Sequence, residues 1–341
     1  MDFGSDNAAG VHPAILSAIQ QAAPAHPAAY DSDAWSARLD AAFSDLFAGP
    51  VRVFPVPSGT AANALALAAA VPPWGGVYAH AEAHIEVDEA GAVPFFTGGA
   101  SLILVSGAAG KLTVEALEAA ASRRRGDVHQ VQPAALTLTQ ATEAGTVYAP
   151  HEVAALAAWA KAQRLAVHMD GARFANAVAH LGCHPADVSW RAGVDILSFG
   201  CIKNGGMTSD AILVFGEALA ATLPVRRKRA GMMPSKGRFA AAQLLAHVEG
   251  GLWLELARRA NMGARALAAA AGARLLYPCE ANEVFVRLTT AERVRLRDAG
   301  FSFYDWELAG ADAARFVVRW DQEEADVAAL AQALAGLGNP A

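Results

Sequence analysis

Residues 194–206, which read VDILSFGCIKNGG, decide the fold of this chain. The first six residues predict a buried strand, and the small residues around Lys203 predict a turn directly after it. The chain has only five lysines, and this one follows an apolar strand. Burial makes an amine less basic, and such an amine can form a Schiff base with an aldehyde. We therefore take Lys203 as the candidate nucleophile.

A second apolar strand at 165–169 ends in the sequence MDGAR, which contains Asp170 and Arg173. Parallel strands end at the same edge of a sheet, where open α/β sheets bind ligands, so Asp170 and Lys203 are expected to meet there. An acid for a pyridinium nitrogen and a lysine for an aldehyde are what pyridoxal 5′-phosphate (PLP) requires. The pair predicts PLP as the cofactor, although a strand-end aspartate can also simply cap a helix.

Strand-like and helical stretches alternate along most of the chain. Strands are predicted at 51–56, 77–80, 102–105, 134–139, 165–169, 194–199 and 211–215, and helices at 11–23, 35–48, 61–71, 113–122 and 151–162. Such alternation predicts a mostly parallel sheet with helices on both faces, which is an α/β fold. A helical stretch at 238–271 leads to strands at 283–287 and 315–319 and a last helix at 323–336. We predict an N-terminal arm and helix at 1–30, a large domain at 31–245 and a small α+β domain at 246–341.

Composition excludes several classes of protein. The net charge of −6 and the pI of about 5.9 argue against nucleic acid as the main partner. The high apolar content comes from alanine, and no run reaches the ~18 residues of a membrane-spanning helix. The first residues lack the basic and apolar regions of a signal peptide, and the three cysteines are not paired in spacing. We expect a cytoplasmic protein with no disulfide framework and no structural zinc.

Ser58, Gly59 and Thr60 stand between a predicted strand and the helix that follows it. Glycine lets the backbone approach a ligand closely, and the first N–H groups of a helix can bind an anion. The tripeptide could thus hold the phosphate of a phosphorylated aldehyde. Alone, it is more typical of an ordinary helix N-cap, and it gains weight only because Asp170 and Lys203 also point to a phosphorylated aldehyde.

The segment His80-Ala81-Glu82-Ala83-His84 has the residue types of a metal site. If it were helical, His80 and His84 would share a face, so a metal-dependent hydrolase using His80, Glu82 and His84 is a remote alternative function. No third ligand with convincing spacing follows, and we predict no metal. The preferred interpretation places one imidazole flat against an aromatic cofactor, where it can exchange protons near neutral pH.

Six short segments, taken in order, resemble the low-specificity L-threonine aldolases, a group of β-eliminating lyases among the fold-type I PLP enzymes. They are residues 5–7, 58–63, 82–84 with 88–89, 168–173, 198–200 with 203–205, and 315–318. The resemblance covers almost the whole chain and implies an aspartate aminotransferase-like architecture, with a three-layer α/β/α large domain and a smaller α+β C-terminal domain.

The resemblance assigns the cofactor contacts. Lys203 would bind the PLP aldehyde, Asp170 would pair with the pyridine nitrogen, and His84 would stack over the ring. Ser58, Gly59 and Thr60 would cradle the phosphate. A cation of a neighbouring subunit would help with the phosphate, and the candidates are Lys236 and Arg238.

The resemblance also assigns the substrate contacts. Ser5, Arg173 and Arg315 would hold the substrate carboxylate, with Arg173 also near the cofactor, and Tyr30 would reach the site near a dimer interface. Some relatives carry a histidine near residues 139–143, where this chain has none, so His84 becomes the leading base.

The implied activity is reversible retro-aldol cleavage of L-threonine, L-allo-threonine and other β-hydroxy-α-amino acids, such as phenylserine, to glycine and an aldehyde. A β-eliminating lyase or an aminotransferase is the alternative within PLP chemistry. The resemblance also implies a homodimer or homotetramer with sites between subunits, acting on a small amino acid and on neither nucleic acid nor membrane.

Overall fold

The large sheet of the computed structural model, which describes residues 1–24, 26–306 and 309–338, has seven strands in the order β1-β7-β6-β5-β4-β2-β3. Their bounds are β1 Arg52–Val56, β2 Gly75–His80, β3 Ser101–Val105, β4 Gln132–Thr139, β5 Ala166–Gly171, β6 Ile196–Phe199 and β7 Asp210–Val214. Only β7 runs antiparallel to its neighbours, β1 and β6. Residues 200–209 between β6 and β7 are too few for the crossover that a parallel pair needs. The predicted mostly parallel sheet is confirmed.

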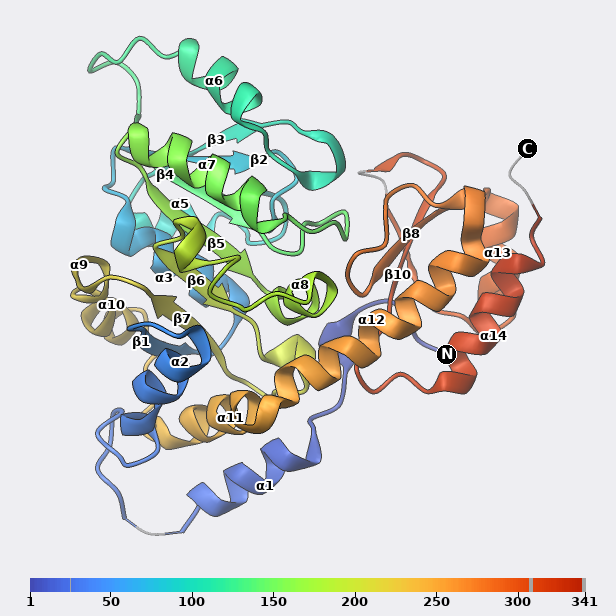
Figure 1. The fold of residues 1–341 in the computed structure, drawn as a ribbon, viewed down its shortest axis with the longest axis horizontal. Helices are drawn as coiled ribbons and strands as arrows, with labels where there is room; N and C mark the ends of the chain where they lie inside the picture. Colours follow the sequence, from blue (N-terminus) through green and yellow to red (C-terminus); the bar gives the residue numbers. More distant parts are fainter. Residues whose placement is uncertain (25, 307–308, 339–341) are drawn as a thin grey trace.

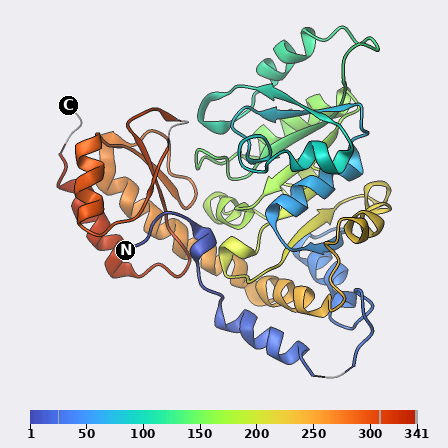
Figure 2. The same ribbon diagram turned by 180° about the vertical axis from the view of Figure 1, so that it is seen from behind.

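Helices cover both faces of this sheet (Figures 1 and 2). α7 (Pro150–Ala162) and α8 (Phe174–Leu181) lie on one face, and α3 (Gly59–Ala70) and α5 (Ala92–Thr97) lie on the other. Strands covered on both sides are mostly apolar, and every residue of β6 and β7 is buried, including the polar Ser198 and Asp210. The other helices of this part are α1 Pro13–Ala22, α2 Leu39–Phe47, α4 His84–Val87, α6 Val114–Ser122, α9 Glu217–Ala220, α10 Leu223–Arg229 and α11 Arg238–Val248.

A small antiparallel sheet, in the order β8-β10-β9, forms the second part of the molecule. Its strands are β8 Glu283–Arg287, β9 Tyr304–Asp305 and β10 Ala313–Val317, and its helices are α12 Leu252–Ala271, α13 Thr290–Asp298 and α14 Glu324–Ala335. It has its own apolar core, which includes Phe3 from the far end of the chain. The amide of Phe3 donates to Ser302 and its carbonyl accepts from Val317, both at 2.8 Å. The N-terminal arm is thereby bonded to the small sheet.

The predicted single helical stretch at 238–271 is wrong at its centre. α11 ends at Val248 and α12 begins at Leu252, because Gly250 and Gly251 adopt the left-handed conformation with φ of 78° and 81°. α12 then passes from the large sheet to the small one, packing against both α8 and α14 (Figure 1). The domain boundary near residue 245 stays a prediction.

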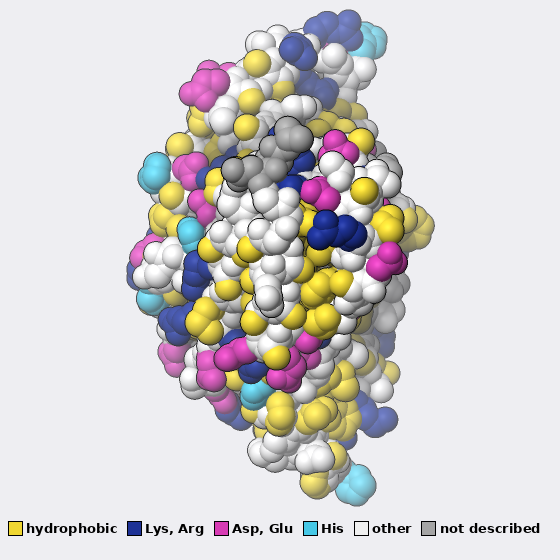
Figure 3. All heavy atoms as spheres, turned by 90° about the vertical axis from the view of Figure 1, so that its right-hand side faces the viewer, with side chains coloured by type: hydrophobic (Ala, Val, Ile, Leu, Met, Phe, Trp, Pro, Cys, Tyr) yellow, Lys and Arg dark blue, Asp and Glu magenta, His cyan; other side chains and the backbone are white. Residues whose placement is uncertain are grey.

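None of the described helices is both long enough and apolar enough to cross a lipid bilayer. Figure 3 shows the side of the small sheet, where basic and acidic side chains are interspersed among apolar ones. This face presents no broad field of one sign that would attract a polyanion.

Candidate active site

The carboxyl ends of β5 and β6 bring the two decisive side chains to one cavity. Asp170 of β5 pairs in register with Ser198 of the parallel strand β6, and Lys203 follows in the short helix η5 (Ile202–Asn204). Both residues line the same cavity. Asp170 is 4% exposed, whereas Lys203 forms no ion pair or hydrogen bond with any described side chain. A buried acid and a free amine thus face one space.

The turn before Lys203 is fixed by a close approach and a buried carboxylate. A Cβ atom on Gly200 would lie 2.3 Å from the carbonyl oxygen of Ala172, so only glycine allows the ends of β5 and β6 to meet. Asp210 of β7 accepts from the amides of Cys201 at 2.7 Å and Ile202 at 3.0 Å. The direction of η5, and therefore the position of Lys203, follows from these contacts.

Five of the predicted residues line this cavity, namely Gly59, His84, Asp170, Arg173 and Lys203. The remaining lining residues are Asn63, Glu89, Thr139, Ala141, Glu143 and Ala172. Ser58 and Thr60 flank Gly59 at the start of α3. The Ser58 hydroxyl accepts from the amide of Ala61 at 3.2 Å and is the N-cap of that helix, in line with the alternative interpretation of the tripeptide.

A chain of hydrogen bonds joins His84 to Asp170 through two residues that the sequence reasoning did not select. The Asn63 amide nitrogen donates to Asp170 at 2.7 Å and to Glu89 at 2.8 Å, and His84 Nδ1 lies 2.8 Å from Glu89. The hydrogen bond to Glu89 raises the pKa of His84 and orients its ring. Asn63 and Glu89 lie inside the quoted segments, and a polar residue within the Ala/Leu-rich α3 was the available signal.

Glu143 is another buried carboxyl group at the cavity that the sequence reasoning did not select. It follows β4, and its Oε1 accepts from the amide of His84 at 2.8 Å and from the hydroxyl of Thr139 at 3.0 Å. Burial, together with the negative charge of Asp170, raises the pKa of Glu143 to about 7. Both protonation states are therefore populated near neutral pH.

Arg173 is held by acidic residues from both ends of the chain. Its guanidinium donates to both carboxylate oxygens of Asp6 at 2.8 and 2.9 Å, and it lies 3.3 Å from Glu283. Burial alone would raise the pKa of Asp6, but the charges of Arg173 and Lys203 lower it to about 2. Arg315 lies 3.6 Å from the same Glu283, so the two predicted arginines converge on one buried carboxylate.

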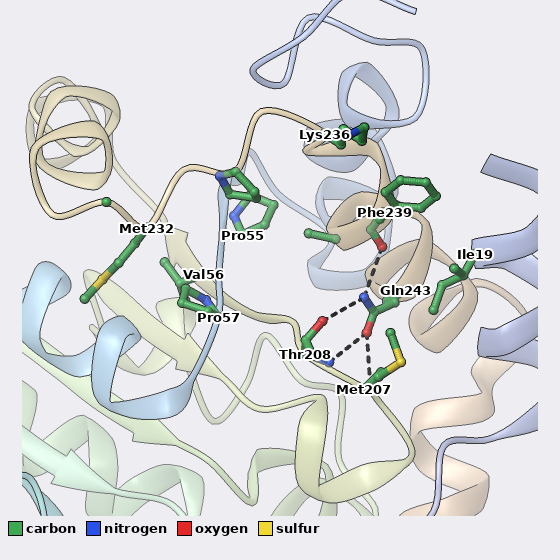
Figure 4. A pocket seen from close by; sticks show the side chains of 13 residues that line it. Ile19, Pro55, Val56, Pro57, Met207, Thr208, Met232, Lys236, Phe239 and Gln243 are labelled. Carbon is green, nitrogen blue, oxygen red and sulfur yellow. Dashed lines mark hydrogen bonds between the residues drawn. The ribbon is translucent and has the colours of Figure 1, made fainter. Parts of the chain in front are cut away.

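Arg315 and four other predicted residues are not among those that line this cavity. The Ser5 hydroxyl accepts from the amide of Asn7, and Tyr30 is exposed beneath the ammonium of Lys228. Arg238 donates to the carbonyl of Ala22 at 2.8 Å. Lys236 lines a separate, mostly apolar cavity of about 540 Å³, together with Pro57, Met207 and Thr208 (Figure 4).

The alternative metal site at His80, Glu82 and His84 required these residues to lie on one helix, and they do not. His80 ends β2 and His84 begins α4, so the two imidazoles do not share one helix face. Both ring nitrogens of His80 are engaged, Nε2 with Gly107 and Nδ1 with the amide of Glu82. Among residues 1–24, 26–306 and 309–338, no group of three or more His, Cys, Asp or Glu side chains is placed to bind a metal ion.

Comparison with known proteins places this geometry in a family. The β-eliminating lyase family model matches residues 2–291. A curated low-specificity L-threonine aldolase of Pseudomonas aeruginosa is 43% identical over 97% of this chain and 96% of its own length. Another low-specificity L-threonine aldolase, from a Pseudomonas species, is 41% identical over 96% of this chain and 95% of its own length.

Solved structures agree with these relatives. The structure of the Leishmania major threonine aldolase superposes with a TM-score of 0.92 at 28% identity, over 98% of this chain and 99% of that one. An aspartate aminotransferase of Rhodobacter sphaeroides, 17% identical over 99% and 92% of the two chains, has a TM-score of 0.72 and shows the same fold. The chain therefore belongs to the β-eliminating lyase family, within its threonine aldolase branch.

Proposed function

We propose that this protein catalyses the reversible retro-aldol cleavage of L-threonine, L-allo-threonine and other β-hydroxy-α-amino acids to glycine and an aldehyde, with PLP as cofactor. The carrying observation is that Lys203 and Asp170 line one cavity at the edge of the large sheet. The close relatives named as threonine aldolases support the choice of reaction.

The residues present fit PLP. Lys203 is a free amine among the described residues, and Asp170 is a buried carboxylate that is not paired with any described cation. Gly59 opens α3, a 12-residue helix. The Ser58 hydroxyl accepts from the amide of Ala61, whereas the amides of Gly59 and Thr60 have no partner within the helix and are available to a phosphate. His84 lines the same cavity and offers a flat ring.

PLP bound here would supply an electron-withdrawing ring that stabilises negative charge on the substrate α-carbon. The protein residues would then do four things. Lys203 would bind the aldehyde of the cofactor covalently. Asp170 keeps the ring nitrogen protonated, and the Asn63 amide fixes this carboxylate. His84, oriented by Glu89, covers the ring.

Arg173 is suited to orient the substrate carboxylate. Asp6 occupies Nε and one proton of Nη2. Nη1 lies 3.3 Å from Glu283 without a hydrogen bond to it, so its N–H groups and the second N–H of Nη2 can still donate. A carboxylate bound there would fix the rotation about the α-carbon and hence which bond breaks. Arg315, which lies 3.6 Å from Glu283, would help Arg173 to bind the substrate carboxylate.

A second copy of the chain is part of this proposal. The apolar cavity of Figure 4 adjoins Pro57, directly before Ser58, and Met207 and Thr208, shortly after Lys203. A neighbouring subunit packed over this region would cover its apolar surface. Lys236 or Arg238 of one subunit and the phosphate of the next are then candidates for contact.

The test is incubation of the purified protein with PLP and L-threonine, followed by assay of acetaldehyde and glycine. We expect both products in equal amounts, and their loss in Lys203→Ala but not in the control Lys161→Ala on the exposed side of α7. Formation of 2-oxobutanoate with ammonia would instead identify an eliminating lyase, and a β-hydroxy keto acid formed without ammonia, in the presence of an added keto acid as amino acceptor, would identify an aminotransferase. Unchanged cleavage in Lys203→Ala would refute the assignment.

A further inference from the structure

Glu143 combines rigid placement with an unused oxygen. Its Oε1 is held by the amide of His84 and the hydroxyl of Thr139, whereas its Oε2 is buried without a partner among the described residues. The turn that contains it is fixed by the hydrogen bond from the amide of Thr142 to the carbonyl of Thr146, and by those from the hydroxyls of both threonines to the carbonyl of Ala109. A buried carboxyl oxygen with no partner, on a rigid loop beside Lys203, is poised for a ligand atom.

The groups around Glu143 allow its carboxyl group to gain and lose a proton near neutral pH. The charged and titratable groups that face it are Asp170 from β5, His84 from α4, Arg173 between β5 and α8, Tyr148 at the end of its own loop, and Lys203 from η5. Burial, followed by the repulsion of Asp170, raises the pKa of Glu143 to about 7. A group that titrates near the working pH is the most effective proton acceptor and donor.

His84, the base expected from the sequence, is less suited to accept a proton. Its Nδ1 is bonded to a buried carboxylate, Glu89, at 2.8 Å, and this hydrogen bond raises the pKa of His84. The interaction favours the protonated imidazole, which is a donor on both ring nitrogens. His84 Nδ1 is thus already occupied by Glu89, which fixes the ring, whereas Glu143 Oε2 has no partner among the described residues.

Resting on the proposed function, we propose that Glu143 is the catalytic residue that accepts the proton of the substrate β-hydroxyl. As the O–H bond breaks, its electrons form the carbonyl of the released aldehyde. The Cα–Cβ bond breaks at the same time, and its electron pair stays on the α-carbon. The proton lies on Glu143 Oε2 and is returned to the oxygen in the direction of synthesis.

Glu143→Gln tests this role because the glutamine oxygen still accepts from His84 and Thr139 while the ionisable group is lost. We expect threonine cleavage to fall about 10²–10⁴-fold, the usual contribution of a positioned acid or base. Exchange of the α-proton of glycine, which involves no β-hydroxyl, should continue at the wild-type rate. The rise of kcat/KM with pH near 7 should disappear in Glu143→Gln and persist in His84→Phe, which keeps a flat ring.

A readout independent of activity uses the cofactor-free protein. Infrared titration should show a protonated carboxylic acid that ionises near pH 7 in the wild type and is absent in Glu143→Gln, with Glu152→Gln outside the cavity as control. The proposal would be overturned if Glu143→Gln lost threonine cleavage and glycine α-proton exchange to the same degree. It would also be overturned if the rise of kcat/KM with pH disappeared in His84→Phe but not in Glu143→Gln. If the wild type cleaves no β-hydroxy amino acid, the proposed function fails; if it does and Glu143→Gln matches it, only this inference fails.

Discussion

Replacing Asn63 by alanine removes the one amide that bridges two buried carboxylates. Asn63 is 2% exposed, and its nitrogen donates to Asp170 at 2.7 Å and to Glu89 at 2.8 Å. A hydrogen bond to a charged group is worth ~1.5–3 kcal/mol. Asp170 keeps the amide of Ala172 and Glu89 keeps His84, so neither carboxylate loses every partner. We therefore expect the free energy of unfolding to fall by about 3 kcal/mol, the low end for two such bonds.

The same substitution should weaken cofactor binding. Without Asn63, the Asp170 carboxylate is no longer held toward the ring nitrogen, and part of the binding free energy goes into ordering it. A loss of about 1.4 kcal/mol corresponds to a tenfold increase in the Kd of PLP. Urea denaturation of the cofactor-free protein and fluorescence titration with PLP measure the two effects separately.

Asn261→Ala is the matched control. Asn261 is equally buried and exchanges two hydrogen bonds of 2.9 Å with Asn176, between α8 and α12. This variant should lose stability without any change in the Kd of PLP. If Asn63→Ala binds PLP as tightly as the wild type, the bridge from Glu89 to Asp170 has no part in holding the cofactor and our reasoning is refuted.

Two further substitutions test how the site is assembled. Gly200→Ala places a Cβ 2.3 Å from the Ala172 carbonyl and should lower the free energy of unfolding, measured by urea denaturation, by about 1–3 kcal/mol. The control Gly216→Ala, whose Cβ would have nothing within 4 Å, should lower it little. Equal losses in the two variants would contradict the close approach at Gly200. Asp6→Asn removes a carboxylate whose pKa falls from 3.8 to about 2 on folding. This shift adds about 2 kcal/mol to the free energy of unfolding of the wild type. The contribution is fully present above pH 4 and is lost as the pH falls through 2. The stability gap between the wild type and Asp6→Asn should therefore close in acid, and a gap that stays constant from neutral pH to pH 2 would contradict the ion pair with Arg173.

Local pattern was sufficient to predict most of the large sheet. The apolar runs that end at Asp170 and before Lys203 predict two buried strands, and adjacent parallel strands necessarily present their ends at one edge. The break between α11 and α12 was missed, although Gly250 and Gly251 stand in the sequence, because glycine within a helical pattern does not by itself reveal its φ.

The supporting residues of the site could not be found in this way. Asn63 meets Glu89 across 26 residues and Asp170 across 107, and Arg173 meets Asp6 across 167. Such partners are set by the packing of α3 and of the N-terminal arm, which no local spacing encodes. The sequence thus points to the amine and the acid but not to the amide and carboxylates that hold them.

The most direct measurement is to reduce the PLP-loaded protein with borohydride and map the labelled peptide by mass spectrometry. The placement of Lys203 and Asp170 in one cavity predicts a single pyridoxyl group, attached to Lys203, and a visible absorbance band that reduction removes. A label on Lys111, Lys236 or any other lysine, or no label in a protein that still cleaves threonine, would contradict it.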